Sequence, residues 1–202
     1  MIKKTLISLM ATTILSGTAM AQGATNGLVI GGQIGYAKFV PWSKIYGHLN
    51  NGGAYLGGIL GYNFALNKKL SIGLETGINY GNRMSKGFPA GVEVHTNLLN
   101  IPIMAVINYY PTGNGFNIFI KNGVAYNRQE EISSDTSQIS SVTTSQWRYI
   151  AAAGIGYQIQ NFNVFTQYTY LFAKKWNDAS SSDTNTNAMN AWTAGITYTI
   201  PM

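Results

Sequence analysis

The chain of 202 residues contains no cysteine, and only 10% of its residues are charged. Without cysteine it cannot be a small secreted scaffold held together by disulfides. A soluble globular domain carries about 25% charged residues, so the low charge argues against that class. Aromatic residues make up 12% of the chain, which excludes an intrinsically disordered protein.

Long hydrophobic runs are also missing. The mean hydropathy is +0.01, and beyond the N-terminus no stretch reaches the roughly 18 apolar residues that a membrane-spanning helix needs. The net charge of +6 is spread along the chain, which argues against nucleic-acid binding. No metal-ligand spacing, phosphate loop or nucleotide fingerprint is found, so neither a metal nor a cofactor is expected. A single domain rich in glycine and tyrosine remains.

The N-terminus predicts export. Two lysines follow Met1 and Ile2, residues 5–18 are apolar or small, and Ala19-Met20-Ala21 forms a small-x-small cleavage site. This layout is typical of a secretory signal peptide that is cut before Gln22. We therefore expect a signal peptide over residues 1–21 and the folded domain over 22–202.

Most of the remaining chain alternates between apolar and small or polar residues with a period of two. The first such stretch places Leu28 and Ile30 on one face and Gly31 and Gln33 on the other. A period of two predicts β-strands with one apolar face. The eight predicted strands cover residues 28–38, 54–64, 70–80, 98–110, 116–127, 147–159, 162–172 and 190–200. At about 11 residues each, they are long enough to cross a bilayer when tilted.

The connections between these strands alternate in length. The long ones are predicted at 39–53, 81–96, 128–146 and 173–189. The short ones are predicted at 67–69, 111–115 and 160–161. Long loops at one end and tight turns at the other are typical of outer-membrane barrels, whose turns lie in the periplasm. The predicted fold class is all-β, an eight-stranded antiparallel up-and-down transmembrane β-barrel.

A closed barrel can span hydrocarbon because all its backbone groups are paired, so the apolar faces should point to lipid. Small and polar residues should fill the narrow lumen. Aromatic residues should form a girdle at each membrane interface. The girdle at the loop end is predicted to contain Tyr36, Phe39, Tyr80, Tyr126, Trp147, Tyr149, Tyr170, Phe172 and Trp192. The girdle at the turn end is predicted to contain Phe64, Tyr109, Phe116, Tyr157, Phe162 and Tyr198.

Several segments together resemble the small OmpA/OmpX-like outer-membrane β-barrel family. They are the Gly31-Gly32-Gln33-Ile34-Gly35-Tyr36 strand, Ile101-Pro102-Ile103-Met104, Tyr109-Tyr110, Gln167-Tyr168-Thr169-Tyr170 and Ala194-Gly195-Ile196-Thr197-Tyr198. The resemblance implies a stand-alone, porin-like barrel at the surface of a Gram-negative cell, without a peptidoglycan-binding domain. The family usually ends on an aromatic residue, whereas this chain ends on Met202.

The resemblance also implies partners. These are outer-membrane lipid and lipopolysaccharide, the barrel-assembly machinery during biogenesis, and a host or other extracellular ligand. We expect no nucleic-acid partner and a monomer. The implied role is structural or a cell-surface interaction, such as adhesion or envelope integrity, and it is not enzymatic. A small pore-forming channel is the first alternative.

A lipid A-modifying barrel enzyme is the weaker alternative. Such an enzyme would use a histidine with a serine and a carboxylate at the rim. This chain has only His48 and His95, both in predicted loops, and no His-x-Ser pattern follows His95. No catalytic residue is therefore assigned.

Three sets of residues are candidates for a functional role. Isolated charges in a narrow lumen are costly, so Glu75, Lys121 and Arg148 should pair there, as a structural plug rather than a gate. Basic residues where the loops leave the barrel could form a collar for lipopolysaccharide phosphates, with ordinary solvation as the alternative. The members of this collar are Lys38, Arg83, Lys86, Arg128, Lys174 and Lys175.

The third set is an unusually apolar group in the first loop. Trp42, Ile45 and Tyr46 could form an adhesive surface there. Packing of these side chains across the barrel mouth, or into the aromatic belt at the membrane interface, is the alternative that we favour.

Overall fold

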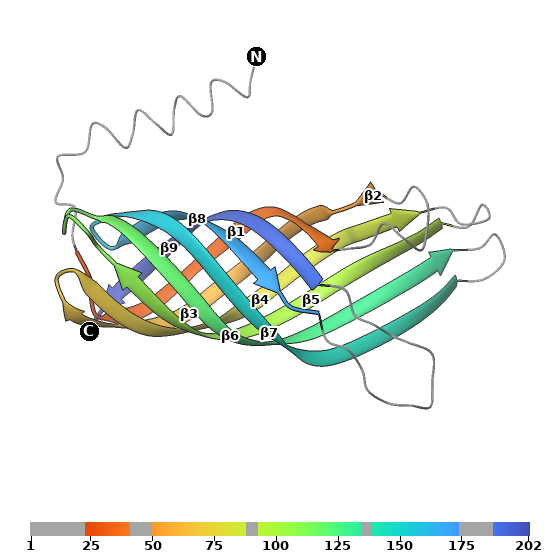
Figure 1. Cartoon of the computed structure of the whole chain (residues 1–202), viewed down its shortest axis with the longest axis horizontal. Helices are drawn as coiled ribbons and strands as arrows, with labels where there is room; N and C mark the ends of the chain where they lie inside the picture. Colours follow the sequence, from red (N-terminus) through yellow and green to blue (C-terminus); the bar gives the residue numbers. More distant parts are fainter. Residues whose placement is uncertain (1–22, 41–49, 88–92, 135–138, 174–187) are drawn as a thin grey trace, which may run out of the picture.

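The computed structural model describes residues 23–40, 50–87, 93–134, 139–173 and 188–202, and these form one sheet (Figure 1). The strands are β1 (Gly27–Val40), β2 (Asn50–Asn51), β3 (Gly53–Asn67), β4 (Leu70–Gly87), β5 (Glu93–Tyr109), β6 (Phe116–Ser134), β7 (Ile139–Ile159), β8 (Phe162–Leu171) and β9 (Ala188–Pro201). No helix among the described residues is long and apolar enough to cross a bilayer.

The sheet closes on itself. Each long strand pairs antiparallel with its neighbours in the order β4-β3-β1-β9-β8-β7-β6-β5, and β4 also pairs with β5. The seam between the first and last strands runs from Gly27 opposite Pro201 to Val40 opposite Ala188. The two-residue β2 adds only to the end of β4, at Lys86 and Ser85. The predicted eight-stranded antiparallel barrel is confirmed.

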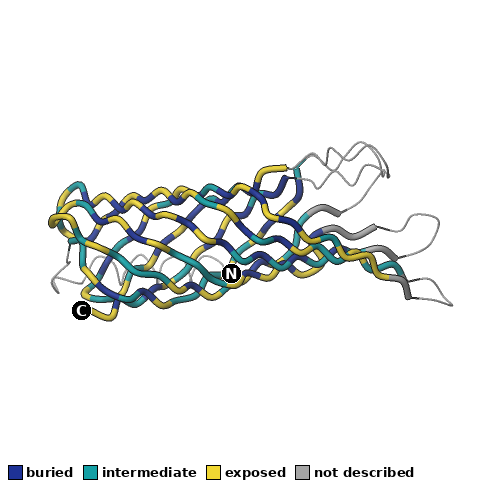
Figure 2. The backbone as a smooth tube through the Cα atoms, turned by 90° about the horizontal axis from the view of Figure 1, so that it is seen from below, coloured by how far each residue is buried: buried dark blue, intermediate teal, exposed yellow. Residues whose placement is uncertain are grey.

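The wall alternates between an outer apolar face and an inner face. Burial changes from residue to residue along each strand (Figure 2), because successive side chains point to opposite sides of a sheet. Ile34 and Leu74 are 67% and 62% exposed on the outer face. Aromatic pairs mark both ends of this face. Tyr126 packs against Trp147 at the loop end, and Phe162 packs against Tyr198 at the turn end.

The three predicted short connections lie together at the turn end. In the first, the Asn67 Oδ1 accepts a hydrogen bond of 2.8 Å from the Lys69 backbone N–H. In the third, Gln160 adopts a φ of 53°, which a tight two-residue turn between twisted strands requires. Local hydrogen bonding and backbone conformation therefore stabilise the short turns at this end of the barrel.

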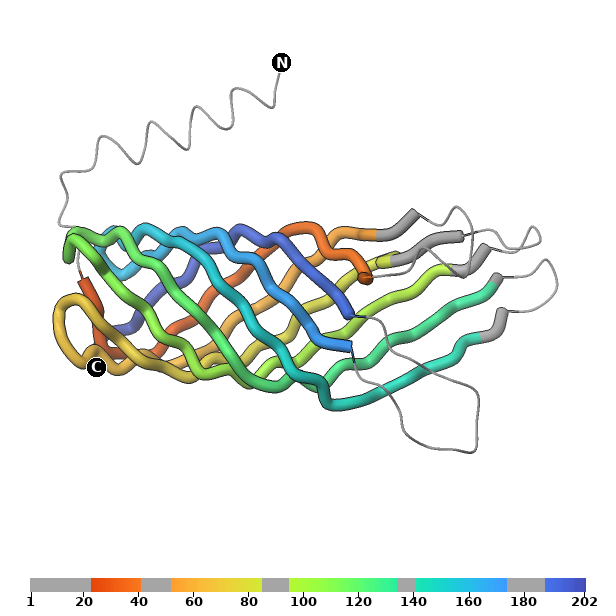
Figure 3. Tube along the Cα trace, viewed as in Figure 1, coloured from red at the N-terminus to blue at the C-terminus, as the bar shows by residue number. Residues whose placement is uncertain are grey.

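At the loop end four strands reach further than the others (Figure 3). Whereas β1 ends at Val40 and β8 at Leu171, β6 continues to Ser134 and β7 begins at Ile139. Most of the predicted loops 81–96 and 128–146 is therefore strand, and that prediction was wrong. Beyond the bilayer both faces of a strand meet water, so no alternation marks it in the sequence. We call this extension of β4–β7 the raised sheet.

A bulge redirects β4 where the raised sheet begins. The register between β4 and β5 shifts between Gly81 and Ser85, and Arg83 has a φ of 48°. The Asn97 Oδ1 accepts a hydrogen bond of 3.1 Å from the Arg83 N–H. Three residues of β4 (82–84) stand opposite Asn97 alone, so the inside-outside alternation is broken within the bulge. Met84 is fully buried there.

The outer half of the lumen holds an apolar cluster beside buried polar residues such as Asn100, Asn127 and Arg148. The fully or nearly fully buried members of the apolar cluster are Ala37, Phe39, Tyr55, Met84, Leu98, Met104, Ala125, Ile150, Leu171, Met189 and Ala191. Two predictions were therefore wrong. The lumen is not filled by small and polar residues alone, and Phe39 belongs to this inner cluster rather than to the outer girdle, because its position along β1 faces inward. This apolar cluster closes the barrel above its polar layers.

Candidate functional site

An ion pair lies inside the barrel. The Lys121 ammonium from β6 donates to both oxygens of Glu75 on β4, at 2.7 and 2.8 Å. The two side chains are 6% and 12% exposed. The ammonium also lies 5.1 Å and 5.4 Å from the ring centres of Phe119 and Phe165, whose faces attract a cation. The predicted pairing of Glu75 with Lys121 is present.

Arg148, the third predicted member, makes a different contact. Its Nε donates a 2.8 Å hydrogen bond to the backbone carbonyl of Phe172, just beyond the end of β8. The side chain is 2% exposed, and the ion pair found for Glu75 is with Lys121. Arg148 therefore ties β7 to the chain that follows β8.

A layer of amides and hydroxyls crosses the lumen near the ion pair. The Gln33 Nε2 donates to the Asn79 Oδ1 at 2.7 Å. The Gln33 Oε1 accepts hydrogen bonds of 3.0 Å from Gln167 and from Thr193. One side chain thus links β1, β4, β8 and β9, and it satisfies polar groups that would be costly to bury alone.

A second polar layer fills the turn end. The Tyr110 hydroxyl donates to the Gln158 Oε1 at 2.9 Å, and Gln158 in turn donates to the Thr25 hydroxyl at 3.2 Å. Burial raises the pKa of Tyr110 to about 12, so its hydroxyl stays protonated and can donate. The open space between this layer and the ion pair is a cavity of about 40 Å³. A cavity of that size holds about one water molecule.

The basic residues of the predicted collar lie at the loop end where the structure describes them. Lys38, Arg83 and Arg128 have exposed side chains on β1, β4 and β6. Lys86 lies in β4, whereas Lys174 and Lys175 fall outside the described residues. An outer pocket of about 210 Å³ is lined by Tyr80, Asn97, Leu98, Leu99, Arg128 and Glu130.

The other sequence candidates are less informative. Trp42, Ile45 and Tyr46 of the first loop fall outside the described residues, as does His48. His95 is part of β5, opposite Lys86 and Ile132, and not of a loop. Among the described residues, no group of three or more His, Cys, Asp or Glu side chains could hold a metal ion.

Comparison with known proteins identifies the barrel. Residues 7–199 match the family described as the outer membrane protein beta-barrel domain. The chain belongs to this family. No curated protein sequence matches the chain.

Several solved outer-membrane barrels share the fold. The attachment invasion locus protein Ail of Yersinia pestis is 13% identical, with a TM-score of 0.55, over 89% of this chain and 100% of its own. Neisserial surface protein A is 12% identical, with a TM-score of 0.54 and the same coverage of 89% and 100%. Ail in complex with the heparin analogue sucrose octasulfate is 14% identical, with a TM-score of 0.50, again over 89% and 100%.

Membership of the family places this outer membrane protein in the cell outer membrane. Short turns of such barrels face the periplasm, and longer loops face the outside. The turn end with Lys68 and Lys69 is thus periplasmic, and the raised sheet stands on the extracellular side. The exposed apolar face between the two aromatic girdles contacts lipid.

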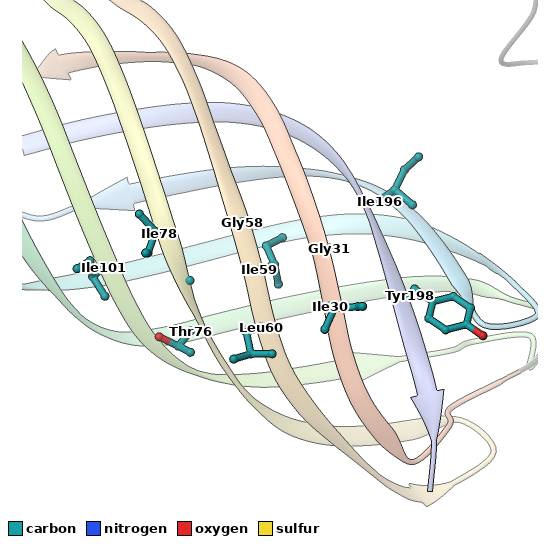
Figure 4. Close-up of a pocket in the computed structure, with 11 residues that line it drawn as sticks. Ile30, Gly31, Gly58, Ile59, Leu60, Thr76, Ile78, Ile101, Ile196 and Tyr198 are labelled. Carbon is teal, nitrogen blue, oxygen red and sulfur yellow. The ribbon is translucent and has the colours of Figure 1, made fainter.

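One hollow interrupts the lipid-facing wall of this outer-membrane barrel (Figure 4). It measures about 870 Å³ and lies over β9, β1, β3 and β4, with Ile101 of β5 at its edge. Ile30, Leu60 and Ile196 border it, and Gly58 leaves its floor without a side chain. Because its lining is almost entirely apolar, the hollow offers no specific polar contact to a ligand.

Proposed function

We propose that this outer-membrane barrel has no catalytic role and binds a protein ligand at the cell surface through its raised sheet. The observation that carries the proposal is an edge of β7 that pairs with no described residue beyond the end of β8. β7 pairs with β6 from Ile139, opposite Ser134, to Tyr157, opposite Phe116. Its pairing with β8 covers only Ile150 to Ile159. No described residue pairs with the other edge of β7 over residues 139–147.

This edge carries hydrogen-bonding groups that point away from the barrel. The Tyr149 carbonyl accepts from the Phe172 N–H on the β8 side, so by alternation the odd residues 141–147 direct their N–H and C=O groups to that side. Residues 141–147 are Ser, Val, Thr, Thr, Ser, Gln and Trp, with no proline and no charged residue. Natural proteins use proline and charged side chains, especially lysine, to keep exposed edges from pairing. An edge without such residues can accept an extended peptide as an added strand.

The experiment compares adhesion of cells that display the protein on immobilised matrix proteins and on cultured epithelial cells. Wild type should adhere more than the empty-vector strain. Thr143→Pro with Ser145→Pro removes two edge donors but leaves the β6 ladder intact, because odd residues do not face β6. Adhesion of this variant should fall to the vector level.

The matched control is Thr143→Val with Ser145→Ala, which changes the same side chains but keeps both N–H groups. It should adhere like wild type. Equal adhesion by wild type and the vector strain would contradict the proposal. A loss in the control as large as in the proline variant would show that side chains, and not the edge, make the contact.

Other parts of the protein support a non-catalytic role. The lumen holds an apolar cluster, two polar layers and an ion pair, which favours a plug over the channel alternative. His95 has no hydrogen-bond partner for its Nδ1 among the described residues, which argues against a triad at the rim. We also propose that residues 1–21 are a cleaved signal peptide and that the barrel-assembly machinery inserts residues 22–202. The names of similar barrels, an attachment protein and a surface protein, agree with a surface role.

We further propose that the collar binds lipopolysaccharide phosphates, because Lys38, Arg83 and Arg128 are exposed just outside the outer girdle. Reversing two of these charges with Arg83→Glu and Arg128→Glu should lower the co-purified lipopolysaccharide by at least about tenfold, because losing even one charge-assisted hydrogen bond has an effect of that size. Mass spectrometry of lipid A per mole of protein measures it.

The control makes the same change of charge at the periplasmic end. Lys68→Glu with Lys69→Glu alters two exposed residues that face the inner leaflet. These substitutions should leave lipopolysaccharide unchanged. An equal loss in both variants, or none in either, would rule out the collar.

A further inference from the structure

A polar side chain interrupts the lipid-facing wall. Asn122 lies on β6 at an outward position and is exposed. The other outward residues around it on this strand, Ile118, Ile120 and Val124, are 45%, 55% and 44% exposed and apolar, as contact with lipid requires. Asn122 is therefore a polar side chain in a row of apolar side chains that face lipid.

Asn122 lies deep within the hydrocarbon. Phe116 and Tyr126 mark the two girdles on the same strand. With a rise of about 3.4 Å per residue and a tilt of about 40°, Asn122 is about 10 Å below Tyr126. Water and lipid head groups do not reach this depth, and acyl chains offer no hydrogen bonds.

The chain itself satisfies only part of this amide. The Tyr149 hydroxyl donates a 2.6 Å hydrogen bond to the Asn122 Oδ1. No described residue accepts from the two N–H groups on Nδ2, and the oxygen retains a second lone pair. A polar group left without partners in hydrocarbon is costly. A second protein surface could supply the hydrogen-bond partners that Asn122 lacks.

The wall around Asn122 is shaped for close approach. Its neighbours across the ladder are Ala105 on β5 and Ala151 on β7, and Ala153 is the next outward residue of β7. These small side chains form a low strip between larger ones such as Ile103 and Ile120. Small residues beside a hydrogen-bonding side chain are what membrane-embedded protein interfaces use to bring backbones together.

We infer that two copies of this chain associate through the β5–β6–β7 wall, with Asn122 on the two-fold axis. A carboxamide carries both a donor and an acceptor. Across a two-fold axis one Nδ2–H of each copy donates to the free lone pair of the other Oδ1, which pairs one of the two N–H groups and the second lone pair of each amide. The proposed dimer differs from the monomer expected from the sequence. It does not depend on the proposed binding by the raised sheet.

The native chain has no cysteine, so a single introduced thiol reports on one position. Ala151→Cys keeps Asn122 and should give a cross-linked dimer in native outer membranes with a short thiol-to-thiol reagent. The matched control is Ile78→Cys on β4, which is 59% exposed to lipid. It should remain monomeric under the same conditions.

Adding Asn122→Leu to the Ala151→Cys variant should lower the yield of cross-linked dimer. In detergent, Asn122→Leu alone should raise the dimer dissociation constant about tenfold relative to wild type, as measured by sedimentation equilibrium. Heat-dependent gel mobility checks that each variant is folded. Equal cross-linking at residues 78 and 151, an adduct only with other proteins, or a dimer unaffected by Asn122→Leu would each overturn the inference.

Discussion

Replacing Lys121 with methionine is expected to destabilise the barrel by about 3–5 kcal/mol, the cost of leaving one partner of a buried ion pair alone. Methionine preserves most of the volume of the stem, so packing changes little. The Glu75 carboxylate, however, loses the ammonium that lies 2.7 Å away. It would then face the rings of Phe119 and Phe165, whose faces repel an anion. Urea unfolding in phospholipid vesicles, followed by tryptophan fluorescence, measures the loss.

The double variant separates the lost charge pair from a packing defect. Glu75→Leu combined with Lys121→Met removes both charges and leaves apolar side chains beside Ile59 and the two phenylalanines. Because an apolar replacement of a buried pair is often neutral or stabilising, we expect most of the stability to return. A double-mutant cycle that gives less than about 1 kcal/mol of coupling would contradict an energetically coupled pair.

The same residues decide between a plug and a gate. Breaking the pair with Glu75→Ala should not open a path for ions, because the Gln33–Gln167 layer and the Tyr110–Gln158 layer still cross the lumen. Planar-bilayer recording of folded Glu75→Ala should show no more current than wild type. A stepwise rise in conductance would favour the gate.

The barrel itself could be predicted from the sequence because lipid and lumen impose opposite demands on alternate residues. That constraint acts on every residue between the girdles. The side chains of residues 70–80 that face lipid can therefore be identified from Leu70, Ile72 and Leu74 alone. The Glu75–Lys121 pair was predictable for the same reason. Both side chains are expected to face the lumen, and a charge without a partner there would destabilise the barrel.

The remaining features lack such a constraint. Outside the membrane no face is forced to be apolar, so the Ser/Thr segment 128–146 resembles a loop although most of it is strand. At Gly81–Ser85 a bulge interrupts the alternation, and no residue pattern marks that interruption before Met84. The Arg148 side chain faces inward, as that of Lys121 does. The distance between Arg148 and Glu75, however, depends on the tilt of the strands, which the sequence does not specify.

The largest effect of any single substitution is expected at Gly35, on the seam that closes the barrel. Gly35 faces inward on β1 opposite Thr193 of β9. An added Cβ would overlap the Trp192 carbonyl oxygen and lie 2.7 Å from the Thr193 Cα. Both are backbone atoms that cannot rotate away, so Gly35→Leu should push β1 and β9 apart. We expect a loss above about 4 kcal/mol, enough to prevent closure.

Gly58 gives the matched control, because it is also a strand glycine of the barrel wall but faces lipid. An added Cβ there meets no atom within 4 Å, and the hollow of about 870 Å³ has room for a leucine side chain. Gly58→Leu should therefore fold, with a gain of up to about 1 kcal/mol from the lost flexibility of glycine. Heat-dependent gel mobility after refolding separates the two cases. A folded Gly35→Leu barrel, or a Gly58→Leu chain that fails to fold, would show that the inner glycines are not what permits β1 and β9 to meet.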